Sequence, residues 1–180
     1  MDLSNLPESL VVQLSKAVED YILHNREKYF ARGTPLTSQQ LAPLEPFFPA
    51  DDLQRVRTVF LEGTRIQDPP FYSMARIMGI KNLPSFSDVA AVTFVDVIVS
   101  HEAFTPELLF HEMVHVVQYS QMSTTKFASF YVNGFIRGGS YDEIPLEKNA
   151  YELESRFRAN CQQTFSVADE VKAWKDAGKF

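Results

Sequence analysis

The chain has 180 residues, of which 45% are hydrophobic, and a formal net charge of −6. A chain of this size and composition can bury one substantial core, so we expect a single domain over residues 1–180. The negative charge and the lack of a basic cluster argue against nucleic-acid binding. The lone Cys161 excludes an intramolecular disulfide bond.

The N-terminal residues, MDLSNLPESLVVQL, contain acidic residues and a proline, and neither a basic region nor a long apolar run. This composition is unlike that of a signal peptide, and no other stretch has the length and apolarity of a transmembrane segment. We therefore expect a cytoplasmic protein that does not associate with membranes. Export by a route that leaves no N-terminal signal is the open alternative.

Residues 1–90 are expected to form a scaffold. An apolar stripe at helical spacing predicts an amphipathic helix over Glu8–Arg32, between Pro7 and Gly33. Thr37-Ser38-Gln39-Gln40 has the form of a capping box, and the prolines after it limit any helix to about two turns. Val56–Leu61 is a candidate strand. Phe71–Met78, between Pro69-Pro70 and Gly79, is a candidate short helix.

Ala91–Ser100, AVTFVDVIVS, is rich in β-branched and aromatic residues and predicts one strand of about eight residues. Asp96 in its middle is unusual for a buried strand, so we expect it to face solvent or an arginine. The strand is either a plain core strand or an edge strand that pairs with an extended substrate.

A helix is predicted after this strand, with Thr105 as its N-cap and Pro106 in its first turn. The uncharged residues around its centre indicate that it is buried nearly all round. Three further helices are expected over Ser123–Arg137, Ile144–Phe157 and Ser166–Ala177. The predicted fold is a helix-rich α+β domain with a small sheet, in which residues 91–164 form the core of the site and residues 165–180 a C-terminal helix.

The buried helix contains the H-E-x-x-H pattern, as His111-Glu112-Met113-Val114-His115. Positions i and i+4 share one face of a helix, so both imidazoles can bind one zinc ion. Zinc lowers the pKa of a bound water to about 7, and Glu112 lies close enough to take its proton. The alternative is a buried helix whose two histidines make ordinary hydrogen bonds.

A catalytic zinc site needs a third protein ligand and one open position. The helix opened by Pro145 offers Glu147, Glu152 and Glu154, and spacing alone does not choose among them. Glu147 belongs to its first turn, whereas Glu154 is expected on a more distal, solvated face.

Two other metal-site classes are excluded by the residues present. A di-iron bundle needs a second Glu-x-x-His, which the chain lacks. A metzincin needs a third histidine six residues after His115, where Gln121 stands.

The stretch from about Val92 to Phe157 resembles the gluzincin group of zinc metallopeptidases, and most of all small bacterial members with LFHEMVHVVQY and IPLE..AY segments. The resemblance implies that His111, His115 and Glu147 bind zinc and that Glu112 is the general base. Tyr151 stands where many relatives have an aspartate that orients a zinc histidine. A tyrosine hydroxyl or a backbone carbonyl would have to replace that aspartate.

Hydrolysis also requires a donor that stabilises the tetrahedral oxyanion. Tyr141, in the loop GGSYDEIP, and His101, between the strand and the metal-site helix, are the candidates.

The sequence thus predicts a zinc-dependent metallopeptidase acting on a peptide or protein substrate. A non-catalytic, zinc-stabilised binding or assembly domain is one alternative, although such a domain has no need of Glu112. A zinc hydrolase of a non-peptide amide or ester is the other. The short N-terminal half implies either a shallow cleft or one that a partner chain completes, and the oligomeric state is left open.

Overall fold

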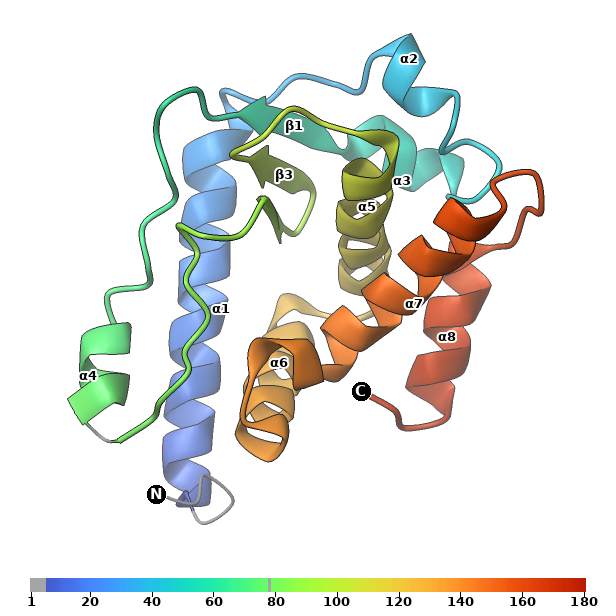
Figure 1. The fold of residues 1–180 in the computed structure, drawn as a ribbon. Helices are drawn as coiled ribbons and strands as arrows, with labels where there is room; N and C mark the ends of the chain where they lie inside the picture. Colours follow the sequence, from blue (N-terminus) through green and yellow to red (C-terminus); the bar gives the residue numbers. More distant parts are fainter. Residues whose placement is uncertain (1–5, 78) are drawn as a thin grey trace.

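The computed structural model describes residues 6–77 and 79–180. Within them the chain forms eight α-helices and one three-stranded sheet, so the predicted helix-rich α+β class is confirmed (Figure 1). None of these helices is both long and apolar enough to cross a membrane. In chain order the elements are α1 Glu8–Phe30, α2 Ser38–Leu41, α3 Ala50–Arg55, β1 Arg57–Phe60, α4 Tyr72–Ile77, β2 Ala91–Phe94, β3 Val97–Ser100, α5 Pro106–Gln121, α6 Thr124–Gly138, the 3-10 turn η2 Tyr141–Glu143, α7 Pro145–Ala159 and α8 Val167–Asp176.

The N-terminal elements agree with the sequence-based expectations. The long helix ends two residues early, at Phe30, and the predicted capping box is present because the Thr37 and Gln40 side chains each accept the other's backbone N–H. The predicted helix over Phe71–Met78 is observed as α4, and Met78 lies outside the described residues. Residues 1–5 of the N-terminal segment also lie outside them.

The expected single strand over Ala91–Ser100 is wrong, because this segment folds back on itself as the antiparallel strands β2 and β3. Val95 and Asp96 form the turn between them, and Val95 takes a φ of 62°, which a β-branched residue rarely adopts. The Asp96 carboxylate accepts two hydrogen bonds from the Arg26 guanidinium, at 2.8 and 2.9 Å. The expectation that Asp96 faces an arginine is confirmed. The turn contains neither glycine nor asparagine, the usual turn residues, and the Arg26–Asp96 pair holds it in place.

The sheet has the order β1-β3-β2, so β2 is an edge strand. β1 and β3 run parallel and β2 and β3 antiparallel. Thr93 on β2 reaches α5 through a hydrogen bond from its hydroxyl to the Glu112 carboxylate. β2 is therefore at an edge of the sheet, and this edge lies beside the H-E-x-x-H motif. Whether it pairs with a substrate stays a prediction.

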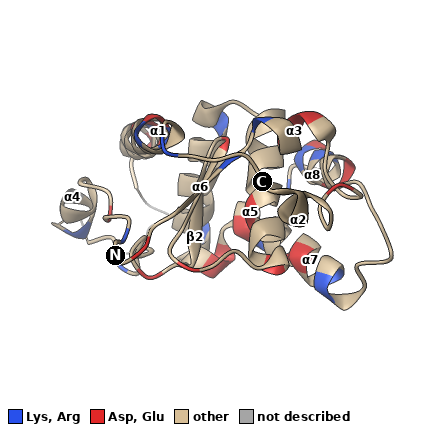
Figure 2. Cartoon of the chain, turned by 90° about the horizontal axis from the view of Figure 1, so that it is seen from above, with Lys and Arg blue, Asp and Glu red and all other residues tan. Residues whose placement is uncertain are grey.

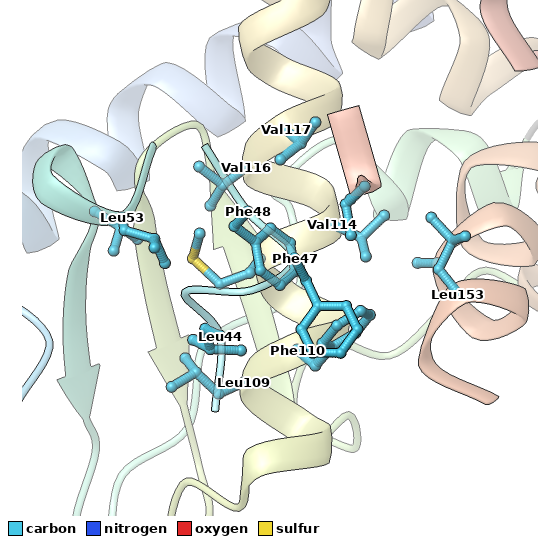
Figure 3. Close-up of a cluster of buried hydrophobic side chains, with 14 of the residues drawn as sticks. Leu44, Phe47, Phe48, Leu53, Leu109, Phe110, Val114, Val116, Val117 and Leu153 are labelled. Carbon is cyan, nitrogen blue, oxygen red and sulfur yellow. The ribbon is translucent and has the colours of Figure 1, made fainter. Parts of the chain in front are cut away.

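α5 lies at the centre of the fold, between the sheet and helices α7 and α8 (Figure 1). Every residue from Leu109 to Tyr119 is buried, which confirms that this helix is covered nearly all round. Apolar side chains from the α2–α3 region and α7 pack around it (Figure 3). Phe110 stacks on Phe157 with ring centroids 4.4 Å apart, and Phe47 and Phe48 meet Phe110 edge to face. This packing fixes the position of the motif relative to α7.

α6 packs closely against the segment that leads into α7. A Cβ atom added to Gly134 would lie 2.5 Å from the Pro145 ring and 3.4 Å from Ile144. Such a distance is shorter than real carbon contacts allow, so a side chain at this position would displace the start of α7. Gly134 therefore permits the close approach that brings the first turn of α7 to its place.

We expect Gly134→Ala to lower the free energy of unfolding by about 1–3 kcal/mol through overpacking. At an unhindered helical position the same change would instead raise the free energy of unfolding by roughly 1 kcal/mol. The sign of the change therefore shows whether Gly134 is in close contact with Pro145. Urea unfolding of the metal-free protein measures it. Lys126→Ala, at an exposed position of α6, is the control. A stabilising Gly134→Ala would show that α7 does not depend on this contact.

Candidate metal centre

His111 and His115 lie one turn apart on α5, and their Nε2 atoms are 3.3 Å apart. The first turn of α7 brings the Glu147 carboxylate to them, with its Oε2 3.5 Å from His111 Nε2 and 3.4 Å from His115 Nε2. All three side chains are buried, and one potential ligand atom from each lies within 4.8 Å of the others. The structure thus gathers the two motif histidines and the acid that the resemblance implied.

The second nitrogen of each imidazole has its own partner. His111 Nδ1 lies 3.1 Å from Glu154 Oε2, and His115 Nδ1 lies 2.9 Å from Gln118 Oε1. Gln118 Nε2 in turn donates to Leu146 O and to Asn149 Oδ1, both at 3.0 Å, which fixes the orientation of its amide. Because both Nδ1 atoms face acceptors, they carry the protons in the neutral imidazoles. The Nε2 lone pairs are then directed toward Glu147, as metal ligation requires.

The expectation that Glu154 is solvated is wrong, since it is only 8% exposed. Glu154 stands two helical turns after Glu147, so both side chains lie on the face of α7 that packs against α5. One turn later, Arg158 forms an ion pair with Glu154. Tyr151 packs its ring against that of His111, with centroids 4.5 Å apart, and is 47% exposed. Neither a tyrosine hydroxyl nor a backbone carbonyl orients His111; the carboxylate of Glu154 does.

Glu112 is buried beside the three clustered residues and has a distinct environment. Its Oε2 accepts a hydrogen bond of 2.6 Å from the Thr93 hydroxyl. Among the described residues no hydrogen bond engages its Oε1. Thr93 was not identified from the sequence, because nothing in a strand residue signals which helix residue it will meet. Gln118 and Asn149 were not identified either. Gln118 stands three residues after His115, so helical spacing would have indicated it, whereas Asn149 is found only through its contact with Gln118.

The metal-free cluster carries strongly shifted pKa values. Burial by itself lowers the pKa of His111 and His115, but the neighbouring carboxylates, chiefly Glu147, raise both above the usual value. Burial likewise raises the pKa of Glu147, and the two imidazoles outweigh it and hold that pKa well below the usual range. A metal ion must displace protons that the histidines hold above their ordinary pKa. Metal binding should therefore release protons and strengthen as the pH rises.

Two cavities meet at Glu112. On the His111 side an open cleft of about 470 Å³ runs past Glu107, Glu154 and Arg158. On the His115 side lies a mostly apolar pocket of about 70 Å³. Tyr141 lines both cavities, as does Glu112, so it stands at their junction. Figure 2 shows acidic residues on α5 and residues of both charges on α7, the two helices that bound the cleft.

His101 lies elsewhere. Its Nδ1 is 2.8 Å from Val89 O, and its Nε2 accepts a hydrogen bond of 3.0 Å from the Ile66 backbone N–H. Both ring nitrogens are therefore used by the backbone, and His101 lines neither of the two cavities. The structure brings Tyr141, and not His101, to the clustered residues.

The donor set fits a zinc ion. Two imidazole nitrogens and one carboxylate oxygen are three of the ligands zinc commonly takes at catalytic sites, with a further position left open. Glu147 Oε2 is buried and has no hydrogen-bond partner among the described residues. In the metal-free protein only the nearby imidazoles compensate this buried oxygen, and a bound cation would satisfy it directly.

Comparisons with protein-family models, with curated proteins and with solved structures give no match. The gluzincin resemblance therefore stays a prediction, and the residues themselves are the evidence for the site.

The three glutamates of α7 should differ in their effect on zinc affinity. We expect Glu147→Ala to cause the largest loss, because it removes a ligand, and Glu154→Gln to lower affinity about 10–100-fold, because it weakens the orientation of His111. Glu152→Ala, on the exposed face of α7, is the matched control and should have no effect. Competition titration with a chelator and metal analysis of the purified variants provide the measurement. A loss confined to Glu152→Ala would refute this ligand assignment.

Proposed function

We propose that this protein is a zinc-dependent metallopeptidase of the gluzincin type. The main support is the buried cluster of His111, His115 and Glu147, with the Glu112 carboxylate beside it at the meeting point of two cavities. A domain that used zinc only for stability would need no cavities there and would usually have a fourth protein ligand.

His111, His115 and Glu147 would hold the metal, which supplies Lewis acidity for activating water and polarising a carbonyl. Glu112 would act as the general base. Thr93 engages Oε2 of its carboxylate, which leaves Oε1 to accept a proton from the attacking water. The same carboxyl group would then pass that proton to the leaving nitrogen, as general acid–base catalysis requires.

Tyr141 would stabilise the oxyanion. It lies at the junction of the cleft and the pocket, where a substrate spanning both must pass. Burial, together with the nearby Glu147, raises the pKa of its phenol well above the ordinary value. The hydroxyl therefore keeps its proton at neutral pH and remains a hydrogen-bond donor.

The edge strand β2 would help to align the substrate. Ala91 lines both cavities and Thr93 lines the pocket, so this strand follows the path between them. An extended peptide can add to such an edge through backbone hydrogen bonds. This alignment favours a peptide over a small amide or ester, which has no extended backbone to pair.

Glu112→Gln should lower kcat by about 10²–10⁴-fold, the usual contribution of a general base, while zinc remains bound. Mass-spectrometric mapping of cleavage in a diverse peptide mixture, combined with metal analysis, measures both properties. Glu102→Gln, at an exposed loop position, is the control. Equal activity of wild type and Glu112→Gln would contradict the mechanism, and zinc binding without turnover of any peptide would favour the non-catalytic alternative.

Tyr141→Phe should lower kcat by about 10²–10³-fold with little change in KM or zinc affinity, because the lost hydrogen bond forms only with the developing oxyanion. Steady-state kinetics on one peptide identified in the cleavage screen tests this. An unchanged kcat would remove Tyr141 from the mechanism.

A further inference from the structure

The apolar pocket beside His115 has walls from two separate parts of the chain. Tyr119, on the metal-site helix, lines the side near the clustered residues. The opposite side is formed by α1, through Val18 and Tyr21, and by the connection between β1 and β2, through Phe71 and Phe86. The Tyr21 and Phe86 rings are in contact, with centroids 5.4 Å apart, so these two walls also pack on each other.

The pocket opens directly on the reacting groups, because Glu112, His115 and Glu147 are part of its lining. A substrate whose carbonyl group is held at these residues would place a neighbouring side chain in it. The walls are mainly aromatic and aliphatic, so burial in them favours an apolar side chain.

The size of the pocket limits what it can hold. Its volume is about 70 Å³. An apolar cavity of roughly 150 Å³ accommodates a benzene ring, so a pocket of half that volume suits a branched aliphatic group and is too small for an aromatic ring.

A second apolar cavity of about 40 Å³ lies beyond the first. The two cavities are separated by the side chains that line both of them, which are Val18, Phe71, Tyr72, Pro84 and Tyr131. The end of the first pocket is thus formed by side chains, and shortening one of them would join the two spaces.

We propose that this pocket selects substrates with a branched aliphatic side chain, such as that of leucine or valine, at a residue flanking the bond to be cleaved. Phe71 sets the upper limit of size. The inference rests on the proposed peptidase function. It gives the N-terminal scaffold a second role, since α1 and the segment around Phe71 form the wall that determines specificity.

Binding of small hydroxamates to the zinc-loaded protein tests the pocket without requiring turnover. Hydroxamates with a methyl, an isobutyl or a benzyl substituent share the metal-chelating group and differ only in the part that would enter the pocket. We expect the isobutyl compound to bind at least about tenfold more tightly than the other two by isothermal titration calorimetry. Peptides that differ only in alanine, leucine or phenylalanine beside the cleaved bond should show the same order in kcat/KM.

Phe71→Ala should reverse the preference, because it joins the two cavities. We expect the benzyl compound to gain about tenfold in affinity and the isobutyl compound to lose affinity. Phe60→Ala, which removes an exposed phenylalanine from β1, is the matched control and should leave the order unchanged. Val18→Phe provides a second test if Phe71→Ala is poorly folded. It should fill the pocket and weaken only the larger compounds.

The outcomes distinguish this inference from the proposed function. Equal affinity for all three hydroxamates, or tightest binding of the benzyl compound to wild type, would overturn the size selection while leaving the zinc site intact. A protein that binds no zinc and no hydroxamate would overturn the proposed function and this inference with it. Binding in the expected order without cleavage of any peptide would support the pocket and count against the peptidase.

Discussion

The burial of carboxylates beside two imidazoles is the interaction on which this structure depends. Glu147 and Glu112 are both almost inaccessible to solvent, and removing an ionised carboxylate from water costs several kcal/mol unless it is paired. In the metal-free protein the histidines compensate Glu147 by holding their protons above the ordinary pKa. A bound cation would compensate it in their place. The same pairing that permits this burial thus prepares the site for a metal.

The hydrogen bonds around the cluster extend this constraint to the rest of α5 and α7. Glu154 holds His111 from α7, and Gln118 links His115 to Leu146 and Asn149 at the start of that helix. The two helices are therefore joined by polar contacts at the site and by aromatic stacking of Phe110 on Phe157 farther along. Precise placement of the ligands follows from this combination, because a shift of α7 would break contacts of both kinds.

The N-terminal half supports the site from the opposite side. Arg26 of α1 fixes the turn at Asp96, and this turn creates the edge strand that presents Thr93 to Glu112. α1 also forms part of the apolar pocket. The N-terminal half therefore shapes the surroundings of the proposed catalytic base and forms one wall of the pocket beside it.

The sequence by itself determined the features that depend on local spacing. The convergence of His111 and His115 follows from a four-residue separation on a helix. The start of α5 follows from the Thr105 cap, and the start of α7 from the fixed φ of Pro145 in its first turn. Glu147 could be chosen over Glu152 and Glu154 only through the resemblance. Spacing leaves all three open, because the orientation of α7 toward α5 is set by packing.

Tertiary structure decided the rest, because it depends on contacts between distant segments. Ala91–Ser100 folds into a hairpin whose turn is bonded to Arg26, which lies 70 residues from Asp96. Residue propensities alone therefore predict one strand. Glu154 is buried because the face of α7 that carries Glu147 also meets His111. His101 is hydrogen-bonded to backbone groups of two loops, at Ile66 and Val89. The sequence around His101 does not predict these partners. A short stretch of sequence predicts whether a helix or a strand forms. Which of its faces becomes buried depends on the distant segments that the fold packs against it.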